Sequence, residues 1–381
     1  MTLSRFPSPQ AATRHAAQPG RRRWLAAAAL ASAGLAGCAR PAVPVAPVVG
    51  GAQEHAADDV PRIDMHSHAG RVSLGHDAAR AASRPFLPVA EAMRAGGLDV
   101  LCLDIVADGS ATRVSADRRK IEPWRTPAPG EMADWARLSF ARAEALIAHE
   151  GLLVASDAAA LRAARRAGPT VIVSSEGADF LEGDIDRLEQ AWREHRLRHL
   201  QLTHYRPNEL GDIQTEAPVH GGLTDFGAEV VRRCNRLGLV VDVAHGTFEL
   251  VRRAAAVSSK PLVLSHTSLS QRAGPRSRQV TPEHARLVAD TGGVVGVWPS
   301  AGVFSSIQAM AEGVARMADA IGIEHVGLGS DMLGFISPPV LQSYRQLPEL
   351  RAALRQAGLS AGDVTKVMGG NYLRVFTAAV G

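Results

Sequence analysis

The chain of 381 residues carries a formal net charge of +4; 46% of its residues are hydrophobic and 21% are charged. This composition favours a globular protein with a large core, and the length suits one α/β barrel with extensions. Residues 1–37 hold five arginines and no acid, so subtracting them from +4 leaves −1 for the rest of the chain. The charge balance therefore does not imply a basic face of the kind that binds nucleic acid, and no nucleic-acid partner is expected.

Residues 1–37 have the features of a bacterial export signal. Arg21, Arg22 and Arg23 precede an apolar run that ends at Ala36, which is shorter than the roughly 20 residues that a bilayer-spanning helix needs. The pattern predicts a signal peptide, and its arginines resemble a twin-arginine signal. The Leu-Ala-Gly-Cys sequence that ends at Cys38 resembles a lipobox, in which that cysteine is lipidated and becomes the first mature residue.

Residues 38–60 are rich in Pro, Ala and Gly and are expected to form a flexible tether. We therefore expect an exported protein on the periplasmic side of a bacterial membrane, which it touches only through lipidated Cys38. A plain secretory signal with an incidental cysteine is the alternative. The other two cysteines, Cys102 and Cys234, lie in apolar surroundings and are expected to be buried free thiols.

From residue 61 onwards, short apolar runs alternate with segments of helical spacing. The runs cover residues 61–68, 98–108, 170–177, 197–208, 237–246, 260–268, 292–300 and 324–332. The segments between them include residues 184–195, 225–238 and 306–322. Such alternation indicates βα units with a parallel sheet, and eight strands close a (β/α)₈ TIM barrel of the type found in metal-dependent hydrolases. Residues 61–381 are therefore predicted to form one catalytic domain.

Polar residues stand at the carboxyl ends of most of these runs, where the active site of such a barrel lies. They are His66, His68, Glu176, His204, His245, His266 and Asp331. Imidazole and carboxylate ligands suit zinc, and so many of them favour two divalent ions that share a carboxylate. None of the three lysines ends a run, so the bridging ligand is expected to be Glu176 and not a modified lysine.

Several pieces of the sequence, taken in order, resemble the renal or membrane dipeptidase family of binuclear zinc peptidases. They include "IDMHSH", "SSEGADFL", "LQLTHYRPNELGD", "LSHTS", "RQVTPEHARLV" and "VGLGSDM". The resemblance implies that His66, His68 and Asp331 hold one zinc ion and that His245 and His266 hold the other, with Glu176 between them. It further implies that His204 contacts the substrate and stabilises the developing oxyanion. Arg278 would bind the terminal carboxylate of a small peptide, and Asp331 would transfer a proton to the leaving amine; a homodimer is suggested by analogy.

Two positions depart from the family pattern. His68 stands where the family usually has aspartate, and "GSDMLG" lacks the second acid of the family's "GSDFDG". The arginine-rich segment 108–131 is expected to be a loop that shapes the mouth of the pocket and favours an acidic or unusual peptide. Two alternatives stay open: an amidohydrolase acting on a lactone, a cyclic amide or an N-acyl amino acid, and a lipoprotein that only binds its ligand.

Overall fold

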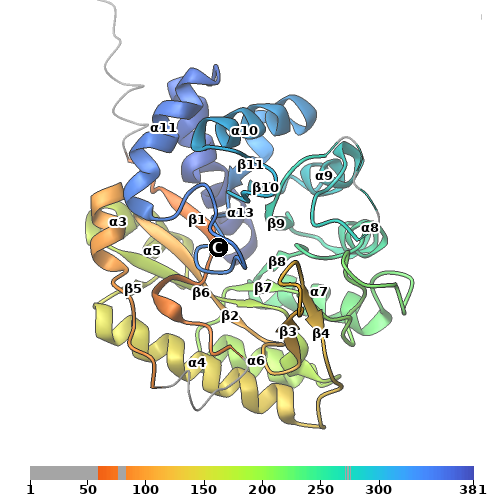
Figure 1. The fold of residues 1–381 in the computed structure, drawn as a ribbon. Helices are drawn as coiled ribbons and strands as arrows, with labels where there is room; N and C mark the ends of the chain where they lie inside the picture. Colours follow the sequence, from red (N-terminus) through yellow and green to blue (C-terminus); the bar gives the residue numbers. More distant parts are fainter. Residues whose placement is uncertain (1–58, 76–82, 271, 273, 275) are drawn as a thin grey trace, which may run out of the picture. The chain divides into compact units, whose positions relative to one another are not determined.

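The structure is a computed structural model, and it describes residues 59–75, 83–270, 272, 274 and 276–381. The predicted signal peptide, the lipidation site Cys38 and nearly all of the predicted tether lie outside these residues. Figure 1 shows the fold of the described part, with strands gathered at the centre and helices around them.

In the described part of the chain, eight parallel strands follow one another around a nearly closed barrel, which confirms the predicted fold. In sheet order they are β1 (Ile63–Ser67), β2 (Val100–Val106), β6 (Thr170–Glu176), β7 (His199–Gln201), β8 (Val240–Asp242), β9 (Val263–Thr267), β10 (Val294–Val297) and β11 (Val326–Leu328). Each lies inside one of the eight apolar runs. The short strand β5 (Leu153–Val154) pairs with the beginning of β6.

The barrel closes between its first strand and the residues that follow its last strand. The amide of Asp331 donates to the carbonyl of His66 at 3.0 Å, and the amide of His68 donates to the carbonyl of Met332 at 2.9 Å. The side chain of Asp64 accepts from the amide of Ser330 at 2.7 Å. This closure joins two distant segments of the chain, since Asp64 and Ser330 are 266 residues apart in the sequence.

Helices cover the outside of the barrel. They are α3 (Ala90–Gly96), α4 (Glu131–Glu150), α5 (Ala158–Ala167), α6 (Asp186–Glu194), α7 (Asp225–Leu237), α8 (Phe248–Val257), α9 (Pro282–Ala289), α10 (Ile307–Ile321), α11 (Leu347–Gln356), α12 (Ala361–Thr365) and α13 (Asn371–Val380). Side-chain hydrogen bonds cap the N-termini of several of these helices. Thr224, Thr247 and Ser306 each accept a hydrogen bond from the backbone amide of the residue three positions later.

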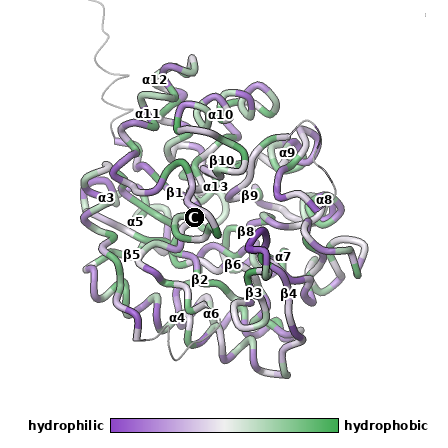
Figure 2. The backbone as a smooth tube through the Cα atoms, in the orientation of Figure 1, coloured by the Kyte–Doolittle hydropathy of each residue, from purple (hydrophilic) through white to green (hydrophobic). Residues whose placement is uncertain are grey.

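The strands are buried on both faces, as parallel barrel strands are. Figure 2 shows hydrophobic colour along the strands and alternating colour along the surrounding helices. Cys102 and Cys234 are both buried and unpaired, as predicted. This packing leaves the loops after the strands as the places where polar side chains gather.

The segment 108–131 is not the simple loop that the sequence predicted. β3 (Thr112–Val114) and β4 (Ile121–Pro123) pair in antiparallel register within it. The turn between them is held by the amide of Ser115, which donates to the carbonyl of Lys120 at 2.9 Å. The two strands have only three residues each, and the turn between them is strongly hydrophilic (Figure 2). Short strands beside a highly charged turn give no clear strand pattern in the sequence, so they were not predicted.

Candidate metal centre and active site

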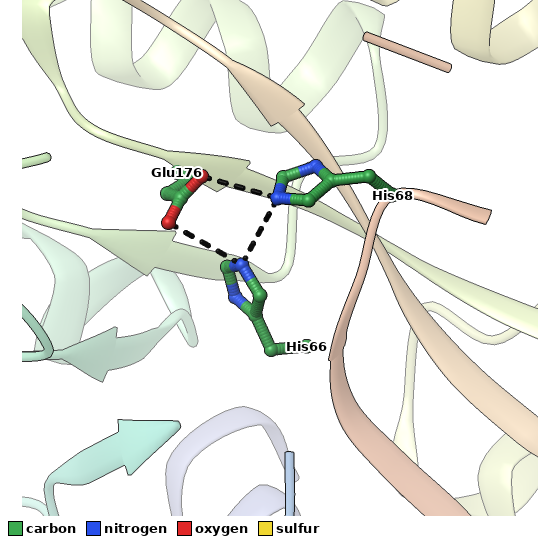
Figure 3. Close-up of side chains that lie close together, drawn as sticks. All are labelled: His66, His68 and Glu176. Atoms are coloured by element: carbon green, nitrogen blue, oxygen red, sulfur yellow. Dashed lines mark hydrogen bonds and ion pairs between the residues drawn. The ribbon is translucent and has the colours of Figure 1, made fainter. Parts of the chain in front are cut away.

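The histidines at the end of β1 point at the same carboxylate. The Nε2 atoms of His66 and His68 lie 3.3 Å apart. They lie 3.4 and 3.2 Å from the two carboxylate oxygens of Glu176, which ends β6 (Figure 3). Because both rings approach through Nε2, the three side chains form a compact group of ligand atoms.

A second pair of histidines also approaches Glu176. The Nε2 atoms of His245 and His266 lie 3.0 Å apart, and they lie 3.2 and 3.5 Å from Oε1 of Glu176. His245 follows β8, and His266 lies in β9. Glu176 therefore belongs to two groups of three candidate ligand atoms. That its carboxylate is shared between two ions stays a prediction.

The chemistry of this donor set fits bound cations. Burial, together with neighbouring positive charge, holds the pKa of His245 and of His266 well below its usual value, so both rings are neutral and offer a lone pair. Burial alone would raise the pKa of Glu176, but His204 and His66 outweigh burial and hold that pKa well below its usual value. A buried carboxylate with converging imidazole nitrogens is a ligand set suited to divalent metal ions.

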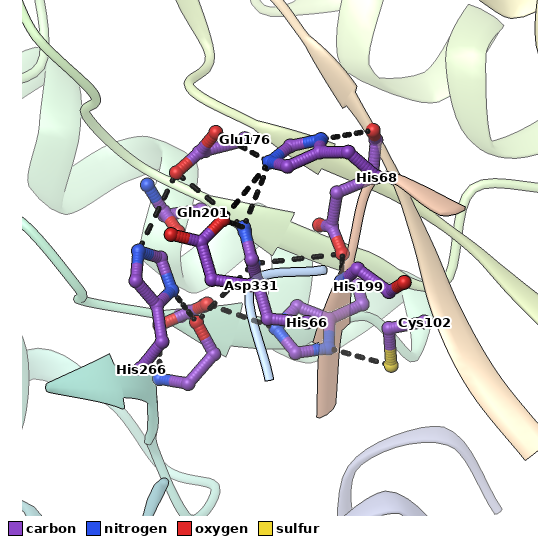
Figure 4. A network of polar contacts seen from close by, with 12 residues as sticks. His66, His68, Cys102, Glu176, His199, Gln201, His266 and Asp331 are labelled. Atoms are coloured by element: carbon purple, nitrogen blue, oxygen red, sulfur yellow. Dashed lines mark hydrogen bonds and ion pairs between the residues drawn. The ribbon is translucent and has the colours of Figure 1, made fainter. Parts of the chain in front are cut away.

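The other ring nitrogens of three of these histidines have partners that orient the rings. Nδ1 of His68 faces the carbonyl of Asp104 at 2.9 Å, and Nδ1 of His266 faces Oγ of Ser265 at 2.9 Å. Nδ1 of His66 lies 3.5 Å from the carboxylate of Asp104. Such partners fix the orientation of metal-binding imidazoles. Figure 4 shows that the network continues into the barrel through His199, which contacts Cys102.

His204 joins the same cluster after β7. Its Nε2 lies 3.1 Å from Oε2 of Glu176, and its Nδ1 lies 2.6 Å from the carboxylate of Asp108. Burial lowers the pKa of His204, but Asp108 and Glu176 outweigh it and raise that pKa to about 9. His204 is therefore held as a charged donor beside Glu176.

Asp331, after β11, lies at the edge of the cluster. Its Oδ1 is 3.5 Å from Nε2 of His68 and 4.0 Å from Nε2 of His66, and it belongs to neither compact ligand group. Burial raises the pKa of Asp331 to about 6. Asp331 and His245 both have positive φ, 48° and 67°. Such backbone strain often gathers at functional sites.

Arg278 lies beside the histidine pair of the second group. Its guanidinium stacks over the ring of Trp298 at 5.3 Å, and that ring lies 5.8 Å from the ring of His266. Nη1 donates to Oε1 of Gln214 at 2.9 Å, while Nε and Nη2 are buried without a hydrogen-bond partner among the described residues. A guanidinium with two buried nitrogens that lack a hydrogen-bond partner suits a carboxylate.

A cavity of about 190 Å³ opens over the cluster. Its floor includes His68, Glu176, His204, His245 and Asp331, and its walls include residues of the β3–β4 hairpin. The predicted role of segment 108–131 in shaping the mouth of the pocket is thus confirmed. Arg278 is not among the residues that line this cavity.

The sequence analysis missed three residues that support the site. Asp104 and Asp108 both belong to the second apolar run. Asp108 ends that run, so its position could have identified it as a site residue. Gln214 lies in a long segment without periodicity, and nothing in its surroundings singled it out. In the structure its backbone N–H donates to the carbonyl of His245 at 2.7 Å, and its side-chain oxygen accepts from Arg278.

A closed parallel barrel with histidine and carboxylate ligands at the carboxyl ends of its strands defines the class of metal-dependent barrel hydrolases. Within that class, residues 131–380 match the model of the membrane dipeptidase family, peptidase family M19. The chain belongs to this family, as the resemblance predicted. The matched region includes Glu176, His245 and His266; His66 and His68 precede it.

Two curated relatives are similar to part of the chain. The chain is 31% identical over 213 residues to dipeptidase aclJ of Aspergillus oryzae, covering 54% of this chain and 50% of that protein. It is 33% identical over 192 residues to dipeptidase tcpJ of Claviceps purpurea, covering 48% and 45%. The chain thus spans about half the length of the curated relatives it matches.

The fold is similar to that of solved structures over most of the chain. An amidohydrolase from Pseudomonas aeruginosa superposes with a TM-score of 0.66 at 22% identity, covering 86% of this chain and 98% of that one. A metallopeptidase from Rhodobacter sphaeroides, solved with a phosphinate mimic of the dipeptide L-Ala-D-Ala, gives a TM-score of 0.67 at 22% identity, covering 84% and 99%. At this identity the similarity establishes the fold.

Proposed function

We propose that this chain is a zinc-dependent dipeptidase that hydrolyses the peptide bond of a small peptide with a free terminal carboxylate. The observation that carries the proposal is the position of Glu176 between two histidine pairs, with two buried guanidinium nitrogens of Arg278 beside the second pair. The curated relatives are named dipeptidases, and the Rhodobacter structure holds a dipeptide mimic.

The residues that would hold the ions are His66, His68 and Glu176 for the first and Glu176, His245 and His266 for the second. Two divalent ions supply, when bound, a water of lowered pKa and a polarised substrate carbonyl. His68 stands where the family usually has an acid, so Glu176 is the one carboxylate of the first group. Asp331 lies at the edge of that group, 3.5 Å from Nε2 of His68.

The other side chains have separate tasks in this proposal. Arg278 holds the terminal carboxylate and so selects short peptides. His204, charged and fixed by Asp108, stabilises the negative charge that develops on the carbonyl oxygen. Asp331, with its pKa raised to about 6 by burial, accepts the proton of the attacking water and delivers it to the leaving amine.

Arg278→Ala tests the substrate class. The lost charge-assisted hydrogen bonds are each worth about 1.5–3 kcal/mol, so kcat/KM for a free dipeptide should fall roughly tenfold to a hundredfold or more. The same dipeptide as its C-terminal amide should be affected much less. The assay compares both forms on wild type and variant, with Arg276→Ala as the control. Equal losses on both forms would remove Arg278 from carboxylate binding.

The test panel also separates the proposed reaction from the two rivals. It includes an N-acetyl amino acid, a cyclic dipeptide and a lactone beside free dipeptides. Preferential turnover of one of these would favour the related amidohydrolase activity. Binding of the peptide without turnover by the zinc-loaded protein would favour a binding protein.

We also propose that the protein is exported and lipid-anchored through Cys38, on the strength of the twin-arginine-like and lipobox-like sequences in residues 21–38. Among the described residues, no helix is both long and apolar enough to cross a bilayer. Cys38→Ser should move the protein from the membrane fraction to the soluble fraction without changing its specific activity. Fractionation of cells carrying each form measures this, and an unchanged membrane fraction would disprove the lipobox.

A further inference from the structure

The cavity over the histidine cluster has one aliphatic wall. Val106 ends β2, Val114 and Ile121 face each other across the β3–β4 hairpin, and Leu333 follows β11; all four line the cavity. The first three are half-buried and Leu333 is exposed. Four aliphatic side chains from three separate segments thus border the cavity above a floor of histidines and carboxylates.

The conformation and the exposure of Leu333 over this cavity are energetically unfavourable for the folded chain. Its φ is +67°, a left-handed conformation that a leucine rarely adopts, and 50% of the residue is exposed to solvent. Neither the backbone conformation nor the exposure benefits the folded chain. A large apolar side chain kept in such a position beside a polar site is explained by a ligand that covers it.

The charges around the cavity favour an uncharged occupant of this wall. The acids among the described lining residues are Glu176 and Asp331, and both belong to the histidine cluster. Arg113 lines the cavity from β3 and pairs with Glu122 at 3.3 Å. A basic side chain placed against the aliphatic wall would meet only the two acids of the histidine cluster and would lie near Arg113. An acidic side chain there would lose its hydration to an apolar surface.

The position of the wall indicates which end of a substrate it contacts. Arg278 does not line this cavity. In the proposed function Arg278 holds the terminal carboxylate, so the cavity is left for the amino-terminal part of the peptide. A cavity of about 190 Å³ has room for a branched aliphatic side chain, since one of roughly 150 Å³ holds benzene.

We propose that Val106, Val114, Ile121 and Leu333 form a binding site for an aliphatic side chain on the N-terminal residue of the substrate, and that Leu333 determines this specificity. The inference rests on the proposed dipeptidase function and narrows its substrate class. It also replaces the expectation of an acidic peptide with an apolar one.

The experiment uses the full-length, zinc-loaded protein and a panel of dipeptides that differ in the N-terminal residue, which is Leu, Ala, Asp or Lys. The C-terminal residue is alanine throughout, and each dipeptide is tested with L-alanine and with D-alanine. Wild type should show a kcat/KM for the leucyl peptide that is ten- to a hundredfold above the aspartyl and lysyl peptides, as expected for burial of one aliphatic side chain.

Leu333→Asp should lower kcat/KM for the leucyl peptide at least tenfold. It should also raise the ratio of kcat/KM for the lysyl peptide to kcat/KM for the leucyl peptide. Aspartate tolerates a left-handed backbone better than leucine, so this variant is expected to fold. Leu333→Gly removes the side chain and the strain together, and it should lose the preference for leucine over alanine. Leu153→Asp is the matched control: that residue is 44% exposed and lies beside the beginning of β6, at the opposite end of the strands.

The outcomes separate the two proposals. Similar kcat/KM for all four peptides, or a leucine preference that survives in both Leu333 variants, would overturn the aliphatic site while the dipeptidase function stands. Failure of the zinc-loaded protein to hydrolyse any peptide of the panel would overturn the dipeptidase function and the inference with it. Loss of the preference in Leu153→Asp as well would show that the effect is not local and would overturn the role of Leu333.

Discussion

Asp108 is a buried carboxylate whose contacts orient the ring of His204 toward the site. One oxygen accepts from Nδ1 of His204 at 2.6 Å, and the other accepts from the amide of Tyr205 at 3.0 Å. Because Nδ1 is occupied in this way, Nε2 of His204 is directed at Glu176. Asp108 does not line the cavity, so it is a positioning residue that acts through His204.

Asp108→Asn should keep this geometry but remove the charge that holds the imidazole in its donor form. We expect kcat to fall roughly tenfold to a hundredfold while KM changes little, because the substrate is anchored elsewhere. Steady-state kinetics measure both constants. Asp117→Asn, in the exposed turn of the hairpin, is the control and should leave both unchanged. A normal kcat in Asp108→Asn would show that His204 needs no such partner.

At the scale of elements, α9 carries a histidine that fits poorly in its surroundings. His284 is 5% exposed, and its ring lies 5.7 Å from the ring of Phe248 in α8. Its Nε2 has no hydrogen-bond partner among the described residues. Burial, with a smaller contribution from the charge of Arg278, lowers the pKa of His284 to about 4. The packing of α8 against α9 therefore requires a neutral imidazole.

This pKa shift makes stability depend on pH in a defined direction. Below the ordinary pKa of 6.5, His284 binds a proton in the unfolded chain, whereas in the folded chain it stays neutral down to about pH 4. The free energy of unfolding therefore falls as the pH drops through this window, by about 2 kcal/mol at pH 5. His284→Leu should flatten this slope, as measured by urea unfolding of the metal-loaded protein at pH 7.5 and pH 5.

The control for this prediction is His149→Leu, at an exposed position on α4. It should show the same change of unfolding free energy between the two pH values as wild type. If His284→Leu also kept the full wild-type slope, the acid sensitivity would belong to other groups and the assigned cost of burying His284 would be wrong.

At the scale of the whole molecule, bound ions would connect strands that are far apart in the sequence. The ligands come from β1, β6 and β9 and from the loop after β8. Ions that bind only the folded chain stabilise it by mass action, by about 4 kcal/mol at a thousandfold excess over Kd. The ions are therefore expected to tie the barrel together as well as to serve the reaction.

Removal of the metal should lower the melting temperature by roughly 5–10 °C. The measurement compares the protein as purified, after chelation and dialysis, and after zinc is added back, with metal content determined on each sample. Zinc should restore the melting temperature, with two ions per chain. Glu176→Gln should weaken this recovery most, since its carboxylate belongs to both groups. Equal melting of the metal-free and zinc-loaded forms would contradict the proposed centre.

The sequence by itself determined the barrel and most of the residues at its mouth. Alternation of apolar runs and helical segments is a local property, and each of the eight runs contains one strand of the barrel. Because parallel strands place their carboxyl ends at one edge, polar residues such as His66, Glu176 and His266 could be expected to meet there. Their roles as ligands remain predictions.

Only the tertiary structure decided which of these side chains touch and what supports them. Closure between β1 and the residues after β11 sets the distance of Asp331 from His68. The contact of Gln214 with Arg278, and the aliphatic wall that includes Leu333, join segments with no common pattern. Such contacts depend on strand register and loop packing over the whole barrel, and neither is encoded in any short stretch of the chain.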